Sequence, residues 1–223
     1  GRMVALVGRT GAGKTALVQL LVRLFDVEAG SVLLDGRDVR SMPLSWLRRQ
    51  VGLVPQDPFL FSATIRDNVA FGLDLNGATD GDARVTWAVH AAGLGRDLAE
   101  MPAGLDTVVG ERGVTLSGGQ KQRVALARVL AAAPRVVILD DALSSVDAGT
   151  EREMLDRMRG FFRERTTILV AHRMSTIREA DLILVLDEGR IVEAGNHDAL
   201  VTRGRVYAEL FQRQALEEEL EAV

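Results

Sequence analysis

The sequence contains no cysteine, which excludes disulfide bonds and cysteine-ligated metal sites and suits a reducing compartment. No apolar run approaches the roughly 18 residues that a membrane-spanning helix needs, and no signal peptide is visible. Surplus positive charge is also missing: the formal net charge is −4, which argues against nucleic acid as a partner. Hydrophobic residues reach 47%, so the 223 residues can build a sizeable core.

A glycine-rich stretch near the start carries the first motif. An apolar run at 3–7 leads into Gly8, and an apolar-periodic segment follows Thr15, so the order is strand, loop, helix. Glycines let successive N–H groups point at one anion, and a helix start adds a positive dipole end. The spacing predicts a phosphate-binding loop, in which Lys14 reaches the β- and γ-phosphates and Thr15 holds Mg²⁺. The residues of this loop are Gly8, Arg9, Thr10, Gly11, Ala12, Gly13, Lys14 and Thr15. The alternative is a plain glycine-rich turn.

The pattern of apolar runs and helical segments predicts an α/β fold with a mainly parallel sheet. Strands are expected at 3–7, 31–34, 37–39, 51–54, 136–139, 167–170, 182–186 and 190–192. Helices are expected at 14–25, 44–50, 80–92, 119–132, 150–162, 175–180 and 198–221. The mostly helical stretch at about 65–130 is interpreted as a subdomain inserted into a core formed by 1–64 and 131–223. Because the chain begins almost directly on the strand before Gly8, we expect an upstream segment of this domain.

Two carboxylates end the apolar strand at 136–139. Strand ends are where ligand groups collect in open α/β sheets. Asp140 is placed to bind Mg²⁺ through water, and Asp141 to orient or deprotonate an attacking water. The alternative, more serious for Asp141, is that these residues cap the next helix.

The stretch Leu116-Ser117-Gly118-Gly119-Gln120 is the most specific signal. A Ser-Gly-Gly turn that opens a helix is a second anion cradle. With this motif the chain resembles the nucleotide-binding domain of ABC transporters, whose signature it matches, and the resemblance covers essentially the whole chain. Gln56 matches that family's Q-loop, 144–147 its D-loop and His172 its switch histidine. Taken singly, Gln56 could be a turn residue and His172 a buried strand-end histidine.

Two further stretches resemble the exporter branch of that family. They are 55–68, and 107–113 just before the signature. The resemblance implies that both segments meet the cytoplasmic ends of transmembrane domains. The alternative is that Phe59, Leu60 and Phe61 are simple core residues.

The resemblance implies a composite site at the cytoplasmic face of a membrane transporter. ATP and Mg²⁺ bind the phosphate loop of one domain under the signature of a second domain in a head-to-tail dimer. The implied catalytic residues are Asp141, His172 and Gln56; the implied metal-binding residues are Thr15, Gln56 and Asp140; and Ser117, Gly118, Gly119 and Gln120 are implied to contact nucleotide.

The chain departs from the family pattern in two ways. It has Asp141 where Glu is usual, so the carboxylate is one methylene shorter. The aromatic residue that stacks on adenine is expected upstream; Trp46 and Trp87 do not occupy its place and are interpreted as packing residues. By resemblance to heterodimeric exporters, a short carboxylate together with a sound signature favours one half of such a heterodimer over a homodimer.

Two other functions stay open. One is a soluble ABC ATPase that acts on DNA or ribosomes; the short run from Gln56 to the signature leaves no room for a long coiled coil, and the acidic balance disfavours nucleic acid. The other is a non-hydrolysing module that dimerises with ATP, which Asp141 keeps open.

Overall fold

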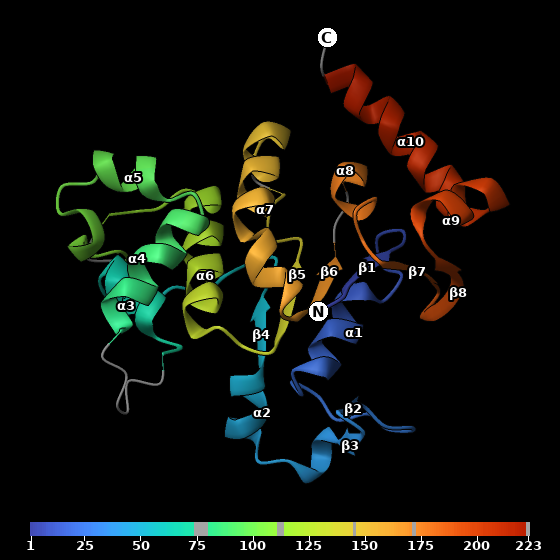
Figure 1. Cartoon of the computed structure of the whole chain (residues 1–223), viewed down its shortest axis with the longest axis horizontal. Helices are drawn as coiled ribbons and strands as arrows, with labels where there is room; N and C mark the ends of the chain where they lie inside the picture. The colour runs from blue at the N-terminus through green and yellow to red at the C-terminus, as the bar shows by residue number, and fades with distance from the viewer. Residues whose placement is uncertain (74–79, 111–113, 145, 171–172, 222–223) are drawn as a thin grey trace.

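The computed structural model describes residues 1–73, 80–110, 114–144, 146–170 and 173–221. Its main feature is a six-stranded sheet in the order β4-β5-β6-β1-β7-β8 (Figure 1). All neighbouring strands pair in parallel except β7 and β8, which confirms the predicted α/β fold with a mainly parallel sheet. The strands are β1 Met3–Val7, β4 Val51–Val54, β5 Val136–Asp140, β6 Thr166–Val170, β7 Leu182–Asp187 and β8 Arg190–Gly195. A separate hairpin joins β2 Leu33–Leu34 to β3 Arg37–Asp38.

Helices cover both faces of this sheet. Successive residues of β1 point to opposite faces, so Leu6 packs in one core and Ala5 and Val7 in another. Such strands read as continuous apolar runs because both of their faces are buried. The helices that accompany the sheet are α1 Lys14–Leu21, α2 Leu44–Gln50, α7 Ala148–Arg163, α8 Met174–Ile177, α9 His197–Arg203 and α10 Val206–Glu221, with a 3₁₀ turn η1 at Val39–Ser41.

Four helices lie together beside the sheet, on the left of Figure 1. They are α3 Ile65–Ala70, α4 Gly81–Ala91, α5 Gly95–Glu100 and α6 Gly118–Ala132, with a 3₁₀ turn η2 at Gly104–Asp106. Their core is continuous with the sheet, because Leu126 of α6 lies in one buried cluster with Val54 of β4 and Met154 of α7. The division at residues 65 and 130 stays a prediction.

Several elements differ in length from the sequence prediction. The helix expected at 14–25 ends at Leu21, since Arg23 adopts a left-handed conformation with φ of 52°. The helix expected at 198–221 is two helices, because Gly204 caps α9 with φ of 63°. The strand expected at 190–192 continues to Gly195, which pairs with Ile183. Asp35 and Gly36 form the turn between β2 and β3, with φ of 49° and 77°, the positive values that a type I′ hairpin turn requires.

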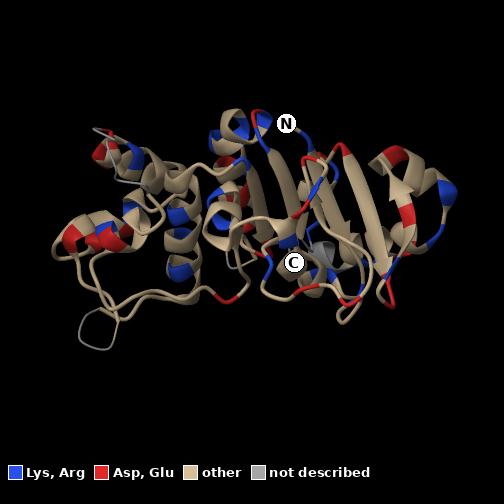
Figure 2. Ribbon diagram, turned by 90° about the horizontal axis from the view of Figure 1, so that it is seen from below, with Lys and Arg blue, Asp and Glu red and all other residues tan. Residues whose placement is uncertain are grey.

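Most charged side chains lie around this framework, and the buried exceptions include Lys14, Asp140 and Glu193. Figure 2 shows Lys, Arg, Asp and Glu mainly on helices and loops, whereas the middle of the sheet is free of these colours. Among the described residues, no helix combines the length and apolar character needed to cross a bilayer.

Candidate functional site

The loop between β1 and α1 is shaped by its glycines. Gly11 and Gly13 have φ of 82° and 99°, which side-chain-bearing residues rarely adopt. A Cβ on Gly8 would lie 2.3 Å from the carbonyl oxygen of Leu186, so only glycine fits beside the end of β7. The N–H of Ala12 bonds the carbonyl of Arg9 at 3.1 Å and closes the loop into a tight turn. The loop is therefore a pre-formed cradle at the carboxyl edge of the sheet.

Lys14 lies inside this cradle. Its side chain is buried, and its ammonium donates hydrogen bonds to the carbonyl oxygens of Gly8 at 2.7 Å and Arg9 at 3.1 Å. Burial lowers the pKa of Lys14 below its ordinary value. The negative charges of Asp141 and Asp140 oppose this shift but do not cancel it. A desolvated ammonium at the start of a helix is suited to an anionic ligand, which can replace the loop carbonyls as its partner. Thr15 follows on α1 with its side chain exposed.

The two carboxylates lie at the end of β5, within the electrostatic reach of Lys14. Asp140 is only 3% exposed and pairs with Val170 of β6. Asp141 adopts φ of 55°, and its N–H bonds the carbonyl oxygen of Val170 at 2.9 Å. The cap of the following helix is Asp147, whose carboxylate accepts the N–H of Thr150. The side chain of Asp141 is therefore not needed as the cap of α7.

Gln56 lies just beyond the end of β4, at the same edge of the sheet. Val54 pairs with Leu139, the residue before Asp140, so both strands deliver polar groups side by side. The side chain of Gln56 is exposed, and its main-chain carbonyl accepts a hydrogen bond from Gln122 of α6 at 3.2 Å. The structure thus brings Lys14, Asp140, Asp141 and the Gln56 segment to one edge.

The signature stretch opens α6 with a capping box. The hydroxyl of Ser117 accepts the N–H of Gln120 at 3.2 Å, and the side-chain oxygen of Gln120 accepts the N–H of Ser117 at 2.9 Å. Ser117 and Gly118 are exposed. Figure 1 shows α6 and α1 on opposite sides of β5 and β6, so the signature stretch lies away from the glycine loop that precedes α1.

The two predicted exporter segments lie side by side. The N–H of Ile65 bonds the carbonyl of Thr107 at 3.0 Å, and that of Val109 bonds the carbonyl of Ala63 at 2.9 Å. Residues 111–113 of the second segment lie outside the described residues.

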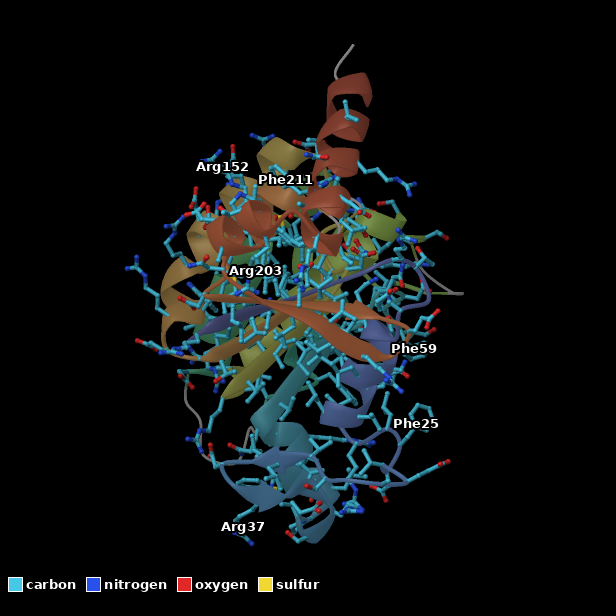
Figure 3. The ribbon with its side chains drawn as sticks, turned by 90° about the vertical axis from the view of Figure 1, so that its right-hand side faces the viewer. Phe25, Arg37, Phe59, Arg152, Arg203 and Phe211 are labelled. Carbon is cyan, nitrogen blue, oxygen red and sulfur yellow. The ribbon has the colours of Figure 1, made fainter. Side chains whose placement is uncertain are left out.

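The aromatic rings beside these segments are surface residues rather than core. Phe59 is 69% exposed and lies at the edge of the molecule in Figure 3. Its ring packs edge-on against Phe61, which in turn packs against Phe71. These three rings are called the aromatic patch below.

His172 and Ser145 lie outside the described residues, so their predicted roles stay predictions. The structure adds a cluster that the sequence analysis missed: buried Glu151 of α7 accepts hydrogen bonds from Arg173 and from the hydroxyl of Thr176. Its residues are distant along the chain, so only the adjacency of Arg173 to His172 could have drawn attention to it.

Among the described residues, no group of three His, Asp or Glu side chains could hold a metal ion unaided. The carboxylate of Asp140 and the hydroxyl of Thr15 could instead form part of a metal site that is completed by ligand phosphates and water. Mg²⁺ at phosphate sites commonly takes one or two protein oxygens together with substrate phosphates and water. The oxygen donors beside a lysine-bearing anion cradle therefore fit a Mg²⁺-phosphate ligand.

Comparison with known proteins agrees with this geometry. A family model described as ABC transporter matches residues 1–144, more than half of the chain. The mitochondrial potassium channel ATP-binding subunit of Homo sapiens is 48% identical over 219 residues, which cover 97% of this chain and 29% of that protein. The ATM1-type heavy metal exporter of Novosphingobium aromaticivorans is 46% identical over 217 residues, covering 97% of this chain and 35% of that protein.

A solved structure of a bacterial Atm1-family ABC exporter with ATP bound superimposes with a TM-score of 0.89 at 46% identity. The match covers 96% of this chain and 37% of the exporter chain. This chain therefore spans about a third of the length of the relatives it matches. The chain belongs to the ABC transporter family, and its fold is that of the nucleotide-binding domain of an ABC exporter.

Proposed function

We propose that this chain is the ATP-binding and hydrolysing domain of an exporter-type ABC transporter. The observation that carries the proposal is the position of Lys14, buried in a glycine cradle with its ammonium on two loop carbonyls and close to two carboxylates. Such an arrangement is suited to a polyphosphate with an associated cation. The proposed substrate is ATP, and the proposed cofactor is the Mg²⁺ that accompanies its phosphates.

In this proposal the residues at the sheet edge divide among them phosphate binding, cation binding and activation of water. The loop N–H groups and Lys14 bind the β- and γ-phosphates, and Thr15, Asp140 and Gln56 hold the cation. Mg²⁺, when bound, neutralises charge on the phosphate oxygens. Asp141 orients the attacking water and accepts its proton, and His172 helps to stabilise the charge that develops on the γ-phosphate.

The signature is proposed to serve a second domain. Ser117, Gly118 and Gly119 are exposed or half-exposed at the start of α6, away from this chain's own cradle. In a head-to-tail dimer they would contact ATP held by the partner. Because the carboxylate of Asp141 is short, we expect slow hydrolysis at this chain's own site. The expected partner is a different chain that carries the longer Glu at the matching position.

The aromatic patch supports a membrane partner. Phe59, Phe61 and Phe71 place adjoining rings on the surface beside the paired segments at 63–65 and 107–109. Exposed apolar groups gathered in one place mark interaction sites. We propose that transmembrane domains of the transporter cover this patch at the cytoplasmic face of the membrane, and that closure around ATP drives export.

Mg-ATP binding and turnover, measured together, test the proposal. The chain should bind Mg-ATP by calorimetry and release phosphate at a rate that rises with protein concentration, because hydrolysis needs a dimer. Binding without turnover at every concentration would favour the non-hydrolysing dimerisation module that Asp141 keeps open. No binding would refute the proposed function.

A further inference from the structure

Asp97 lies in the first turn of α5 and contacts the signature helix. Its Oδ1 accepts hydrogen bonds from Nε2 of Gln120 at 3.0 Å and from Nη2 of Arg123 at 3.0 Å, and its Oδ2 accepts from the same Nη2 at 2.9 Å. The side chains of Asp97 and Arg123 are only 17% and 16% exposed. One carboxylate of a neighbouring helix therefore holds two consecutive turns of α6.

This contact determines how the amide of Gln120 is oriented. A carboxylate can only accept hydrogen bonds, so it requires the NH₂ end of the amide. The oxygen end is then turned toward the N–H of Ser117, which it accepts at 2.9 Å. Asp97 thus selects the amide orientation that completes the capping box, and the capping box fixes the backbone of the Ser-Gly-Gly turn.

Arg123 makes Asp97 hard to replace. Within the described part of the chain, its Nε is buried with no hydrogen-bond partner, and its Nη2 donates to both carboxylate oxygens of Asp97. A largely buried guanidinium that loses its counter-charge is costly and tends to move toward water. Loss of the carboxylate would therefore disturb α6 at Gln120 and at Arg123 together.

We infer that Asp97 is a positioning residue for the signature, which it aligns toward the γ-phosphate held by the partner domain. The inference rests on the proposed function, because the signature acts only in a dimer around ATP. Asp97 would touch neither nucleotide nor water itself. It would act through Gln120 and the backbone of Ser117 and Gly118, whose displacement by about 1 Å can cost 10²-fold in rate.

The test is Asp97→Asn, which keeps the size of the side chain but offers an amide that can donate as well as accept. We expect Mg-ATP affinity at the chain's own phosphate loop to stay within twofold of the wild type, while turnover falls by about tenfold or more. Asp97→Glu, which keeps the carboxylate, should restore part of the rate. Asp82→Asn is the matched control, because Asp82 is 91% exposed and lies in the same group of helices.

A mixing experiment separates positioning from a folding defect. Lys14→Ala has a damaged phosphate loop and a sound signature, and Asp97→Asn has the reverse. In a mixed head-to-tail dimer, one composite site receives the sound half of each chain. The mixture should therefore turn over ATP faster than the sum of the two variants measured alone.

Three outcomes would overturn the inference: wild-type turnover in Asp97→Asn, a mixture no faster than the sum, or a fall in ATP affinity that parallels the loss of rate. If Asp97→Asn does not fold, Gln120→Glu replaces it. That variant keeps an acceptor for the N–H of Ser117 but removes the donor to Asp97, and unchanged turnover in it would overturn the inference as well. A wild type that neither binds nor hydrolyses Mg-ATP would refute the proposed function itself.

Discussion

The side-chain amide of Gln122 donates a hydrogen bond to the main-chain carbonyl of Gln56 at 3.2 Å, across 66 positions of the sequence. Gln56 belongs to the segment that leaves β4, and Gln122 lies just past the signature on α6. The same helix reaches the aromatic patch through Arg128, which lies over the rings of Phe61 and Phe71. One helix, α6, therefore contacts the segment after β4 and the proposed membrane-facing surface, and it begins at the signature.

Lys14→Ala should weaken Mg-ATP binding without unfolding the chain. The ammonium contributes charge-assisted hydrogen bonds, each worth roughly 1.5–3 kcal/mol, so affinity should fall about tenfold to a hundredfold. Calorimetry on the wild type and the variant measures the difference. Lys121→Ala is the control, because Lys121 lies exposed on α6 and should leave binding to the isolated chain unchanged. Equal affinities of Lys14→Ala and the wild type would contradict the assignment of this loop.

Arg128→Lys should destabilise the fold. The guanidinium of Arg128 donates to the carbonyls of Asn68 at 2.8 Å and Phe59 at 3.1 Å, and to Oδ1 of Asn68 at 3.0 Å. Burial lowers the pKa of Arg128. A lysine cannot reproduce this planar set of donors, so acceptors on Asn68 and Phe59 lose their hydrogen bonds. We expect a loss of about 2 kcal/mol in the free energy of unfolding by urea denaturation.

The control for this loss is Arg135→Lys. Arg135 and its partner Asp35 are both 70% exposed, and a surface ion pair of this kind contributes about 0–1 kcal/mol. If Arg128→Lys and Arg135→Lys change urea stability equally, Arg128 does not hold the segment that carries Phe59.

The parts of the site that the sequence predicted are those with a local physical cause. The cradle around Lys14 follows from glycine conformations and from the strand before it. Asp140 and Asp141 could be placed because an apolar run fixed the end of β5. The parallel sheet could be predicted because its strands alternate with helical segments, and because strands buried on both faces read as nearly continuous apolar runs.

The parts that could not be predicted depend on contacts distant along the chain. Asp97 reads as an ordinary charge in the first turn of a helix, and only packing of α5 against α6 gives it Gln120 and Arg123. Glu151 reads as a solvated helix residue, yet its side chain is buried and accepts a hydrogen bond from the partly exposed Arg173. The exposed position of Phe59 contradicts the ordinary expectation for an aromatic side chain, because burial is decided by what the neighbouring segments leave uncovered.

Tyr207 should titrate far above the usual range. It is fully buried, its hydroxyl lies 2.8 Å from Nδ1 of His197, and burial raises its pKa to about 12. The chain has a single tyrosine, so ultraviolet absorbance of the phenolate reports this group alone. The midpoint should lie near pH 12 in the folded chain and near 10 in the unfolded chain. A folded midpoint near 10 would mean that Tyr207 is open to water.

The same shift predicts a loss of stability at alkaline pH. A group whose pKa is raised by folding contributes its stability below the unfolded pKa and loses it as pH rises through the folded pKa. This contribution should therefore be intact up to about pH 10 and lost by about pH 12, amounting to roughly 2–3 kcal/mol. Urea denaturation across this interval measures it. Tyr207→Phe should remove this part of the pH dependence.

Asp141→Glu should raise steady-state ATPase activity at protein concentrations that allow dimerisation. The added methylene brings the carboxylate nearer to the attacking water, and placement errors of about 1 Å near a reacting group cost up to 10²-fold in rate. Asp141→Asn should not raise the rate, because an amide cannot accept the proton. The backbone at Asp141 has φ of 55°, a conformation that Asp and Asn adopt more readily than Glu. A small decrease in melting temperature should therefore accompany the Glu variant only.

Asp141→Glu and Asp141→Asn distinguish a site whose hydrolysis is limited by the short carboxylate from a site that is fully active with Asp. If the wild type is slow and Asp141→Glu is faster despite its lower melting temperature, the shorter carboxylate limits hydrolysis, and a partner chain with Glu becomes the expected arrangement. If the wild type already hydrolyses ATP briskly and Asp141→Glu changes nothing, Asp141 reaches the water unaided. The chain would then pair with a second copy of itself, because each of the two identical composite sites would already hold a competent carboxylate.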